Sequence, residues 1–391
     1  MRIGILLFST PGYSETFFTS KIKGLLQNGH SITLFCQTNT DDFDLCNVEL
    51  LPKRHSNSII QSVLLFFEFI MLIPFYNRVK RFVDFEKSQR TSFSKIIKKV
   101  YLNAPFFKTK LDWVHFGFAT AAIGRENIPK AIGARMAVSF RGFDIAIYPL
   151  KNPGCYGLLW ENVDKVHTIS DDLLYLAYRL GLSKNVSFEK ITPAININKF
   201  QPKAHQNHEK TKQTLKLLTV GRLHWKKGLV DSLKALSILK KNGVQFQYQI
   251  VGDGPQFEEL IFSINHLDLT NEVDLLGKKS HNDVIAIMNQ ADIYIQYSQS
   301  EGFCNAVLEA QAMQLICVVS DAEGLPENVI NDETGFVVPK FQPEKLAKKI
   351  QEILLLTEAQ KNRITNHARK RVHKDFNLVK QKKAFNEFYR N

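Results

Sequence analysis

Short apolar segments alternate with amphipathic segments along most of the chain, and this alternation constrains the fold more than any other feature. Short apolar runs favour buried strands, whereas apolar residues that recur with the helical period favour helices. A chain that alternates the two is typical of parallel sheets covered by helices. The strands predicted in this way are residues 3–8, 32–36, 112–116, 136–140, 166–169, 215–220, 246–251, 293–296 and 316–320.

The alternation stops once and then starts again. Residues 196–214 are polar and contain Pro202 among many Lys, Gln, Asn and His residues, which is the composition of a linker. The sequence therefore predicts two α/β domains, residues 1–200 and 201–371, each with a doubly wound parallel sheet. Ligands bind such sheets outside the carboxyl ends of the strands. We therefore expect the functional residues in the loops that follow strands.

Length and composition are ordinary for a folded protein. The chain has 391 residues, of which 44% are hydrophobic and 23% are charged, enough for two or three domains. Its five cysteines are widely spaced and include no C-x-x-C pair. This spacing argues against a disulfide scaffold and a cysteine zinc site, and it is typical of a protein in the reducing cytoplasm.

The positive charge is concentrated in the first half of the chain. The formal net charge is +13, and residues 78–110 contain ten Lys and Arg residues against Asp84 and Glu86. The apolar stretch 59–75 precedes them, but Pro74 ends it short of the roughly 20 residues that a membrane-spanning helix needs. Two interpretations remain open: a helix lying on an anionic membrane surface, or a buried helix followed by a solvated basic helix. No recognised nucleic-acid-binding motif accompanies this charge, so we expect no nucleic-acid partner.

The loop after the first predicted strand, residues 9–15, has a composition that suits an anion. Gly12 permits a tight turn, and Glu15 stands at the start of a predicted helix with free backbone N–H groups. The pattern G-x-G-x-x-G of dinucleotide-binding proteins is absent from this loop. Many strand–helix turns have a similar composition, so this loop by itself indicates little about function.

The loop after the first strand of the second domain combines glycines with basic side chains. Gly221 and Gly228 enclose Arg222 and Lys227, and a predicted helix follows. A guanidinium and an ammonium near a helix N-terminus suit a diphosphate, although a solvated basic loop has the same composition. Gly252, after the next strand, either lets the backbone approach a ligand closely or forms a plain turn.

Two glutamates follow the predicted strand 293–296. Glu301 lies in the loop after this strand, and Glu309 lies inside the next helix among small and apolar residues. A carboxylate on a buried helix needs a partner or a ligand hydroxyl. The alternative is that Glu309 is a solvated residue on the helix surface.

Several segments together resemble a known family. In chain order they read PGYSETF, DWVHFGFA, SFRGFDI, GRLHWKKG, VGDGP, SEGFCNAVLEA, SDAEGLPENV and DETGFVV, and they extend from residue 11 to residue 338. The chain thereby resembles the family 4 retaining glycosyltransferases of the GT-B fold, of the bacterial exopolysaccharide and lipopolysaccharide biosynthesis type. The resemblance implies two Rossmann-like domains facing a central cleft, and a final helix, residues 372–391, that crosses back to the first domain.

The resemblance also implies a donor-binding site in the second domain. Arg222 and Lys227 would hold the diphosphate of a nucleoside diphosphate sugar and stabilise the charge of the leaving group. Glu301 would contact the sugar hydroxyls, and Glu309 would accept both ribose hydroxyls. Sugar or phosphate would also bind backbone N–H groups before the following helix, those of Phe303, Cys304 and Asn305.

Arg141 is the main departure from the family pattern. The family has a histidine there, near the reacting centre, and an arginine cannot act as a base. The acceptor proton would then pass to Asp144, to His115 or to the leaving phosphate. His115 is also open to another interpretation, that of a core histidine at a strand end. On the acceptor side we expect Glu15, His115 and Arg141.

Two glycines and two substitutions complete the comparison with the family. Gly252 of the second domain and Gly12 of the first would lie against the donor. Gln314 and Glu323 stand where the family commonly has glycine. Glu323 could narrow the choice of donor or repel a phosphate.

The resemblance therefore implies a retaining hexosyltransferase that needs no metal and no cofactor. Arg222, Lys227, Glu301 and Asp144 are its candidate catalytic residues, and fixed cations and helix-end amides can neutralise a leaving diphosphate. The partners would be a nucleoside diphosphate sugar and a glycan or lipid-linked acceptor, at the inner face of the cell membrane. Two alternatives remain: an inactive GT-B scaffold of a polysaccharide assembly complex, and a GT-B sugar-nucleotide epimerase or phosphorylase.

Overall fold

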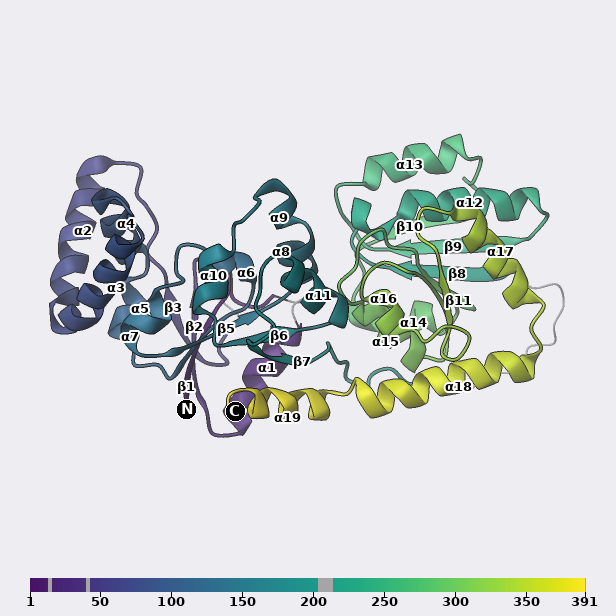
Figure 1. Ribbon diagram of the computed structural model, residues 1–391. Coiled ribbons are helices and arrows are strands. Elements are labelled where there is room, and N and C mark those ends of the chain that lie inside the picture. Colours follow the sequence, from purple (N-terminus) through teal and green to yellow (C-terminus); the bar gives the residue numbers. More distant parts are fainter. Residues whose placement is uncertain (13–15, 40–42, 203–213, 391) are drawn as a thin grey trace. The chain divides into compact units, whose positions relative to one another are not determined.

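The chain folds into two compact α/β units, as the predicted fold class requires. The computed structural model describes residues 1–12, 16–39, 43–202 and 214–390. Unit 1 comprises Met1–Ile191 with Gln381–Asn391, and unit 2 comprises Thr192–Lys380 (Figure 1).

The limits of the units differ from the predicted limits at residues 200 and 371. Residues 192–200 belong to unit 2, where Ile195 forms a backbone bridge with Asn377. The helix that contains Val372 also stays in unit 2, where this side chain is fully buried. The polar linker composition did not reveal these contacts, because they join segments that are distant in the sequence.

Unit 1 contains a parallel sheet with the strand order β3-β2-β1-β4-β5-β6-β7. The interior strand β1 pairs with β2 and β4, and Ile3 and Ile5 of β1 are fully buried. The strands are β1 (Arg2–Leu6), β2 (Ser31–Cys36), β3 (Asn47–Leu50), β4 (Trp113–Phe116), β5 (Arg135–Ser139), β6 (Lys165–Thr168) and β7 (Ser187–Lys190).

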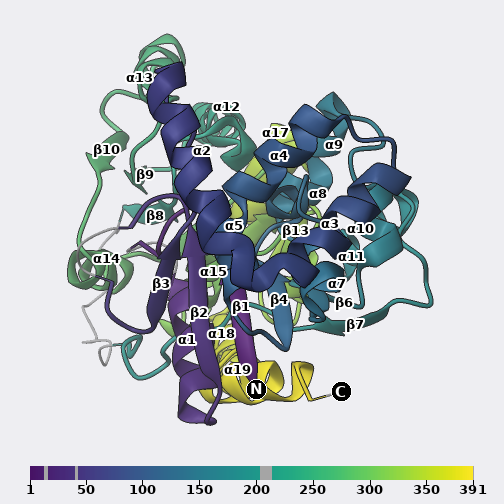
Figure 2. The same ribbon diagram turned by 90° about the vertical axis from the view of Figure 1, so that its left-hand side faces the viewer.

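The helices of unit 1 include one from the end of the chain. This helix, α19 (Leu378–Phe388), lies beside α1 (Figures 1 and 2), and the unit 1 core includes Phe385, Phe388 and Tyr389. The other helices are α1 (Thr16–Gln27), α2 (Ser58–Leu72), η1 (Ile73–Phe75), α3 (Tyr76–Ser88), α4 (Phe93–Leu102), α5 (Ala104–Lys108), α6 (Ala119–Ala122), α7 (Ile128–Ile132), α8 (Gly142–Ala146), α9 (Tyr148–Lys151), α10 (Gly157–Asn162) and α11 (Asp171–Arg179).

Unit 2 repeats this architecture with the strand order β10-β9-β8-β11-β12-β13, again with parallel pairing. Its strands are β8 (Leu215–Val220), β9 (Phe246–Val251), β10 (Val273–Gly277), β11 (Ile293–Gln296), β12 (Ile316–Ser320) and β13 (Phe336–Val338). Its helices are η2 (Trp225–Lys227), α12 (Leu229–Lys241), α13 (Phe257–His266), α14 (His281–Met288), α15 (Asn305–Ala312), α16 (Leu325–Asn328), α17 (Pro343–Leu354) and α18 (Glu358–Asp375).

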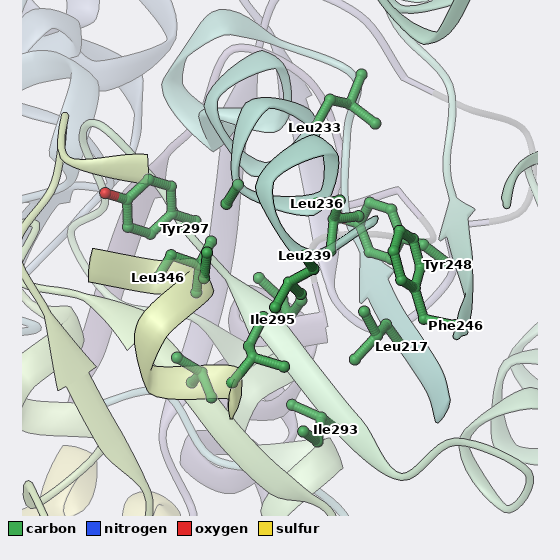
Figure 3. Close-up of a cluster of buried hydrophobic side chains, with 14 of the residues drawn as sticks. Leu217, Leu233, Leu236, Leu239, Phe246, Tyr248, Ile293, Ile295, Tyr297 and Leu346 are labelled. Carbon is green, nitrogen blue, oxygen red and sulfur yellow. The ribbon is translucent and has the colours of Figure 1, made fainter. Parts of the chain in front are cut away.

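The core of unit 2 lies between the sheet and α12. Figure 3 shows Leu233, Leu236 and Leu239 of α12 close to Phe246 and Tyr248 of β9, and none of these side chains is more than 3% exposed. The leucines recur with the helical period, so one face of α12 is apolar and buries itself against the sheet. The other face of this helix contacts water or the neighbouring helix α17.

The predicted strands are present, and β8, β9, β11 and β12 have the predicted limits. The sequence pattern missed β3, β7, β10 and β13, which are the outermost strands of the two sheets. The sequence of β7 is SFEK, and three of its four residues are exposed. Because an edge strand is only partly covered, it does not need the continuous apolar run that identifies a central strand.

Candidate active site

The candidate donor-site residues of unit 2 follow the two strands at which the strand order reverses. From β8 the sheet extends through β9 to β10 on one side, and through β11 to β13 on the other. The chain continues from β8 to β9 and from β11 to β12, on opposite sides of this point, which is where open α/β sheets bind ligands. The loop after β8 carries Arg222 and Lys227, and the loop after β11 carries Glu301 and leads into α15 with Glu309.

Lys227 and Glu301 form an ion pair that joins these two loops. Their side chains are only 16% and 15% exposed. Burial lowers the pKa of Lys227, but the attraction of Glu301 outweighs this effect and the pKa lies above its ordinary value. The Ser298 hydroxyl lies 3.5 Å from the same carboxylate. The ammonium and the carboxylate are thus held in position before any ligand binds.

The backbones of the two loops also contact each other. The N–H groups of Gln299 and Ser300 donate to the carbonyl oxygen of Lys226, with N···O distances of 2.7 and 3.2 Å. Gly228 has a φ of +59°, and a Cβ at this position would lie 2.1 Å from the carbonyl oxygen of Tyr297. Only glycine permits this approach, so Gly228 sets the spacing of the ion pair.

Arg222 lies exposed at the start of the first loop. Burial lowers the pKa of His224, and the positive charge of Arg222 lowers it further. The charge of Arg222 also acts to lower the pKa of Lys227. Arg222 and Lys227 are therefore close enough to interact electrostatically. Two cations at this separation can bind the same polyanion.

Glu309 is a carboxyl group without a compensating partner. It is itself only partly buried and lies on α15 between the buried residues Leu308 and Ala310. Burial raises the pKa of its carboxyl to about 8, because no cation or hydrogen-bond donor in the described part of the chain offsets the loss of water. A ligand that presents two hydroxyl donors would satisfy this group and favour its ionised form.

One prediction for the start of α15 is wrong. The backbone N–H of Cys304 donates to the side-chain oxygen of Asn328 at 2.9 Å, and the Asn328 amide returns a bond to the Cys304 carbonyl at 3.0 Å. This N–H therefore holds α16 against α15 and does not face a ligand. Phe303 and Asn305, on either side of it, remain the candidates for binding sugar or phosphate through their backbone.

Two positions where the family commonly has glycine carry larger residues on left-handed backbone. The φ angles are 59° at Gln314 and 30° at Glu323. The Glu323 carboxylate accepts the N–H of Glu301 at 2.6 Å and lies 3.2 Å from the ammonium of Lys340. Lys340 therefore balances the charge of Glu323, which weakens the alternative that this carboxylate repels a donor phosphate, and Glu323 supports the loop that carries Glu301.

The glycines predicted to face the donor have different surroundings. Gly252 has a φ of +148°, and a Cβ there would lie 1.8 Å from the carbonyl oxygen of Gly221. Packing between the loops after β8 and β9 thus explains this glycine, which favours the alternative of a plain turn. Gly12 in unit 1 is exposed. Glu15 lies outside the described residues.

His115 of unit 1 belongs to a buried hydrogen-bond network rather than to an exposed edge. Its Nδ1 lies 2.6 Å from the hydroxyl of Tyr389, and its Nε2 lies 2.7 Å from the hydroxyl of Ser139. Ser139 continues to His167 at 2.8 Å, and Lys21 lies 3.1 Å from the His115 ring. With no exposed surface, His115 is the core histidine of the alternative interpretation, and this burial contradicts its predicted contact with the acceptor.

Burial disfavours positive charge in this network. It lowers the pKa of Lys21 well below its usual value, with a further contribution from the positive charge of Arg141. The pKa of His115 and that of His167 are lowered in the same way, first by burial and then by neighbouring cations. Buried polar side chains that satisfy each other's hydrogen bonds avoid the cost of unpaired polar groups in a core.

Asp144 and Arg141 lie at the start of α8. One oxygen of Asp144 accepts the N–H of Arg141 at 2.8 Å and the other accepts the N–H of Ala119 at 2.7 Å. Burial raises the pKa of this carboxyl to about 7. Asp144 therefore serves as a helix cap, which disagrees with its predicted role toward the acceptor proton. The guanidinium of Arg141 stacks 3.9 Å from the ring of Phe17.

Sequence reasoning missed three residues that position the donor-site loops: Ser298, Asn328 and Lys340. Ser298 lies just before one of the segments that resemble the family, and Asn328 lies within another. These segments were therefore a signal in the sequence that pointed to both residues. Lys340 follows β13, and only the pairing of β13 with β12 brings it toward Glu323.

One known protein family matches most of unit 2. Residues 200–371 match the family model described as glycosyl transferases group 1. The predicted resemblance is thereby confirmed for the half of the chain that carries the ion pair and Glu309.

Relatives match a larger part of the chain. AmsK of Erwinia amylovora, an amylovoran biosynthesis glycosyltransferase, is 28% identical over 71% of this chain and 69% of its own length. WcaL of Escherichia coli, described as a colanic acid biosynthesis glycosyltransferase, is 28% identical over 69% of this chain and 68% of its own length. The chain is thus a glycosyltransferase related to polysaccharide biosynthesis enzymes.

Solved structures show the same fold over the whole chain. Sucrose-phosphate synthase of Thermosynechococcus elongatus matches with a TM-score of 0.75 at 18% identity, covering 100% of this chain and 98% of its own. HepE of Anabaena, solved with UDP-glucose, matches with a TM-score of 0.70 at 16% identity, covering 99% and 98%. The fold is therefore GT-B, as predicted.

Proposed function

We propose that this chain transfers a hexose from a nucleoside diphosphate sugar to a glycan or lipid-linked glycan in cell-surface polysaccharide biosynthesis. The proposed transfer retains the anomeric configuration and needs no metal ion. The observation that carries the proposal is the Lys227–Glu301 ion pair at the switch point of unit 2, together with Glu309 on the helix that follows the Glu301 loop, where burial raises the pKa of its carboxyl. Support for the substrate class comes from AmsK and WcaL, named for polysaccharide biosynthesis, and from HepE, solved with UDP-glucose.

In this proposal the charge of the leaving diphosphate is neutralised by Arg222 and Lys227. Glu301 receives sugar hydroxyls while its ion pair keeps it in place, and Glu309 receives the ribose hydroxyls. Cations fixed before the reaction stabilise developing negative charge without reorganisation, so they can replace a metal ion here.

The leaving phosphate takes the acceptor proton in this proposal, rather than Asp144 or His115. Both oxygens of Asp144 already accept backbone N–H groups, and both ring nitrogens of His115 have partners in the core. A phosphate oxygen that leaves from the face that the acceptor enters is also positioned for retention.

In this proposal the reaction takes place in the cytoplasm, at the inner face of the cell membrane. The cysteines of the chain are free thiols, and two of them are only partly buried. Free thiols are typical of a reducing compartment.

Thermal stability with a panel of nucleotides tests the donor site. A bound ligand raises the melting temperature by mass action, so UDP, GDP and ADP and their sugars are compared with Mg²⁺ and with EDTA. We expect one base to raise it equally in both conditions. A shift that needs Mg²⁺ would contradict metal independence, and no shift with any nucleotide would favour an inactive scaffold.

The anomeric proton signals of the product test the stereochemistry. The coupling constant of the new glycosidic bond is compared with that of the donor by NMR, and we expect the same configuration. An inverted product would reject the retaining mechanism, and release of an altered sugar nucleotide without transfer would favour an epimerase.

A further inference from the structure

Helix α2 exposes an apolar face that the rest of unit 1 leaves uncovered. Among the fifteen residues of α2, Leu72 is the buried one. Its large apolar side chains are between 44% and 76% exposed at Ile59, Val63, Phe66, Phe67, Ile70 and Met71. Soluble proteins rarely leave a continuous apolar surface of this kind in water unless it binds something.

The opposite side of α2 packs on its own unit. Leu65, Glu68 and Leu72 recur with the helical period and are buried or partly buried, and α2 contacts α4 and α5. Glu68, the charged residue of α2, forms an ion pair with Lys108 of α5. The exposed face therefore contains no charged side chain, and the opposite face fixes the helix to the protein.

This packing decides how α2 can meet a bilayer. The helical stretch Ser58–Ser88 is long and apolar enough to cross a membrane by length and composition, yet only 6% of its most apolar window is buried. Its apolar part, α2 with η1, has 18 residues and is about 27 Å long at 1.5 Å per residue, short of the roughly 30 Å hydrocarbon core. The remainder, α3, is polar and packs on α4 and α7. A helix held in this way can lie in the membrane plane, but it cannot span.

The surface beside α2 is basic. Figures 1 and 2 show α2, α3 and α4 together on one side of unit 1. The exposed basic residues of α3 and α4 are Lys80, Arg81, Lys87, Lys95 and Lys98. A cavity of about 330 Å³ between α2 and α4 is lined by Arg54, Lys95 and Lys98 together with Leu65 and Tyr101.

This charge favours an anionic bilayer over a second copy of the chain. Two copies that paired through α2 would bring their basic surfaces together and repel each other, whereas anionic headgroups attract them. Apolar side chains bordered by Lys and Arg are typical of helices that lie at the interface of anionic membranes.

We propose that α2 is an in-plane membrane anchor: its apolar face, from Ile59 to Met71, inserts below the headgroups of an anionic bilayer, and the basic residues of α3 and α4 contact lipid phosphates. The proposal rests on unit 1 alone and is independent of the transfer reaction. It selects the membrane-surface interpretation of the sequence over that of a buried helix.

Flotation of the full chain with lipid vesicles tests the anchor. The vesicles contain phosphatidylcholine alone or with about a third phosphatidylglycerol, at low and at high salt. We expect strong binding to the anionic vesicles, weaker binding to the neutral ones, and partial release by salt. Failure to bind anionic vesicles would overturn the proposal.

A matched pair of variants separates the α2 face from general surface hydrophobicity. F66S/F67S removes two exposed side chains of α2, and I261S/F262S removes two exposed side chains of α13 in unit 2. We expect at least a tenfold loss of vesicle binding for F66S/F67S and none for I261S/F262S. Equal binding by F66S/F67S and the unaltered chain would reject the assignment.

Three controls make each result decisive. Thermal unfolding and the nucleotide-induced shift should be unchanged in F66S/F67S, because both residues are exposed and lie outside unit 2. Carbonate extraction should release the bound protein, and retention would indicate a spanning helix. A dimer in sedimentation that F66S/F67S dissociates would assign the face to a second copy and overturn the proposal.

Discussion

The two sheets are wound alike, yet they hold ionisable groups in opposite ways near the carboxyl ends of their strands. In unit 2, Lys227 and Glu301 are paired as ions, and Glu309 has no charged partner among the residues that the structure describes. In unit 1, His115 and Lys21 are fully withdrawn from water in a network closed by the C-terminal helix. The same fold therefore holds charged side chains that can bind a ligand in unit 2, whereas in unit 1 the ionisable side chains are buried by packing.

The largest expected effect comes from breaking the ion pair. We expect K227A to lower the transfer rate by about 100-fold or more, because it removes a fixed cation from the leaving group. Initial rates at saturating donor measure this loss. Lys348, a 72% exposed lysine of α17, supplies the control: K348A should transfer at the normal rate. Full activity in K227A would remove Lys227 from the proposed site.

The pH dependence of stability tests the isolation of Glu309. Its pKa of about 8 lies above that of the unfolded chain, so the folded state holds a proton that the unfolded state has lost between about pH 5 and pH 8. The stability contributed by this proton is present at low pH and is lost as pH rises through about 8. Unfolding in guanidinium at pH 5, 6.5 and 8 should show this loss relative to E309Q, whose side chain does not titrate. Parallel curves for the two proteins would indicate an unperturbed carboxyl.

Nucleotide binding should lower the raised pKa of Glu309 again. Ribose hydroxyls that donate to Glu309 favour its ionised form, so nucleotide binding should release a proton near pH 8 and strengthen as the pH rises toward that value. Calorimetry in two buffers of different ionisation enthalpy measures the released proton, which should be absent for E309Q.

A smaller effect is expected from the contact between α15 and α16. N328A leaves the N–H and carbonyl of Cys304 without their partner, which should reduce the free energy of unfolding by about 1–3 kcal/mol. The melting temperature should fall by several degrees. N282A, at an exposed residue of α14, is the control. A change in N328A no larger than in N282A would show that this contact does not hold the helices together.

The smallest effect is expected in unit 1. Y389F removes the hydroxyl beside His115 and should cost about 1 kcal/mol of stability with little change in transfer rate or nucleotide affinity. If Y389F instead lowered the rate tenfold at unchanged stability, the buried network would have to communicate with the reaction, and the contrast between the two edges would fail.

The site was predictable to different degrees in these two regions. The loop motifs around Arg222 and Glu301 are local, and the structure places them at neighbouring strands as the α/β pattern requires. The roles of His115 and Asp144 were not predictable, because a polar residue near a strand end has the same local pattern whether it faces water or the core. The N–H of Cys304 is a similar case, since its partner Asn328 lies in another helix.

Hydrophobic periodicity by itself determined the two α/β units, their central strands and the buried face of α12, because burial on both sides of a strand or on one side of a helix leaves a repeating local pattern. Tertiary structure decided everything that depends on which distant segment covers a side chain. It paired Lys227 with Glu301 across 74 residues, enclosed His115 with the C-terminal helix, and left α2 uncovered although its sequence is as apolar as that of a core helix. A local pattern records how apolar a face is, but the surface that covers it is chosen only when the chain packs.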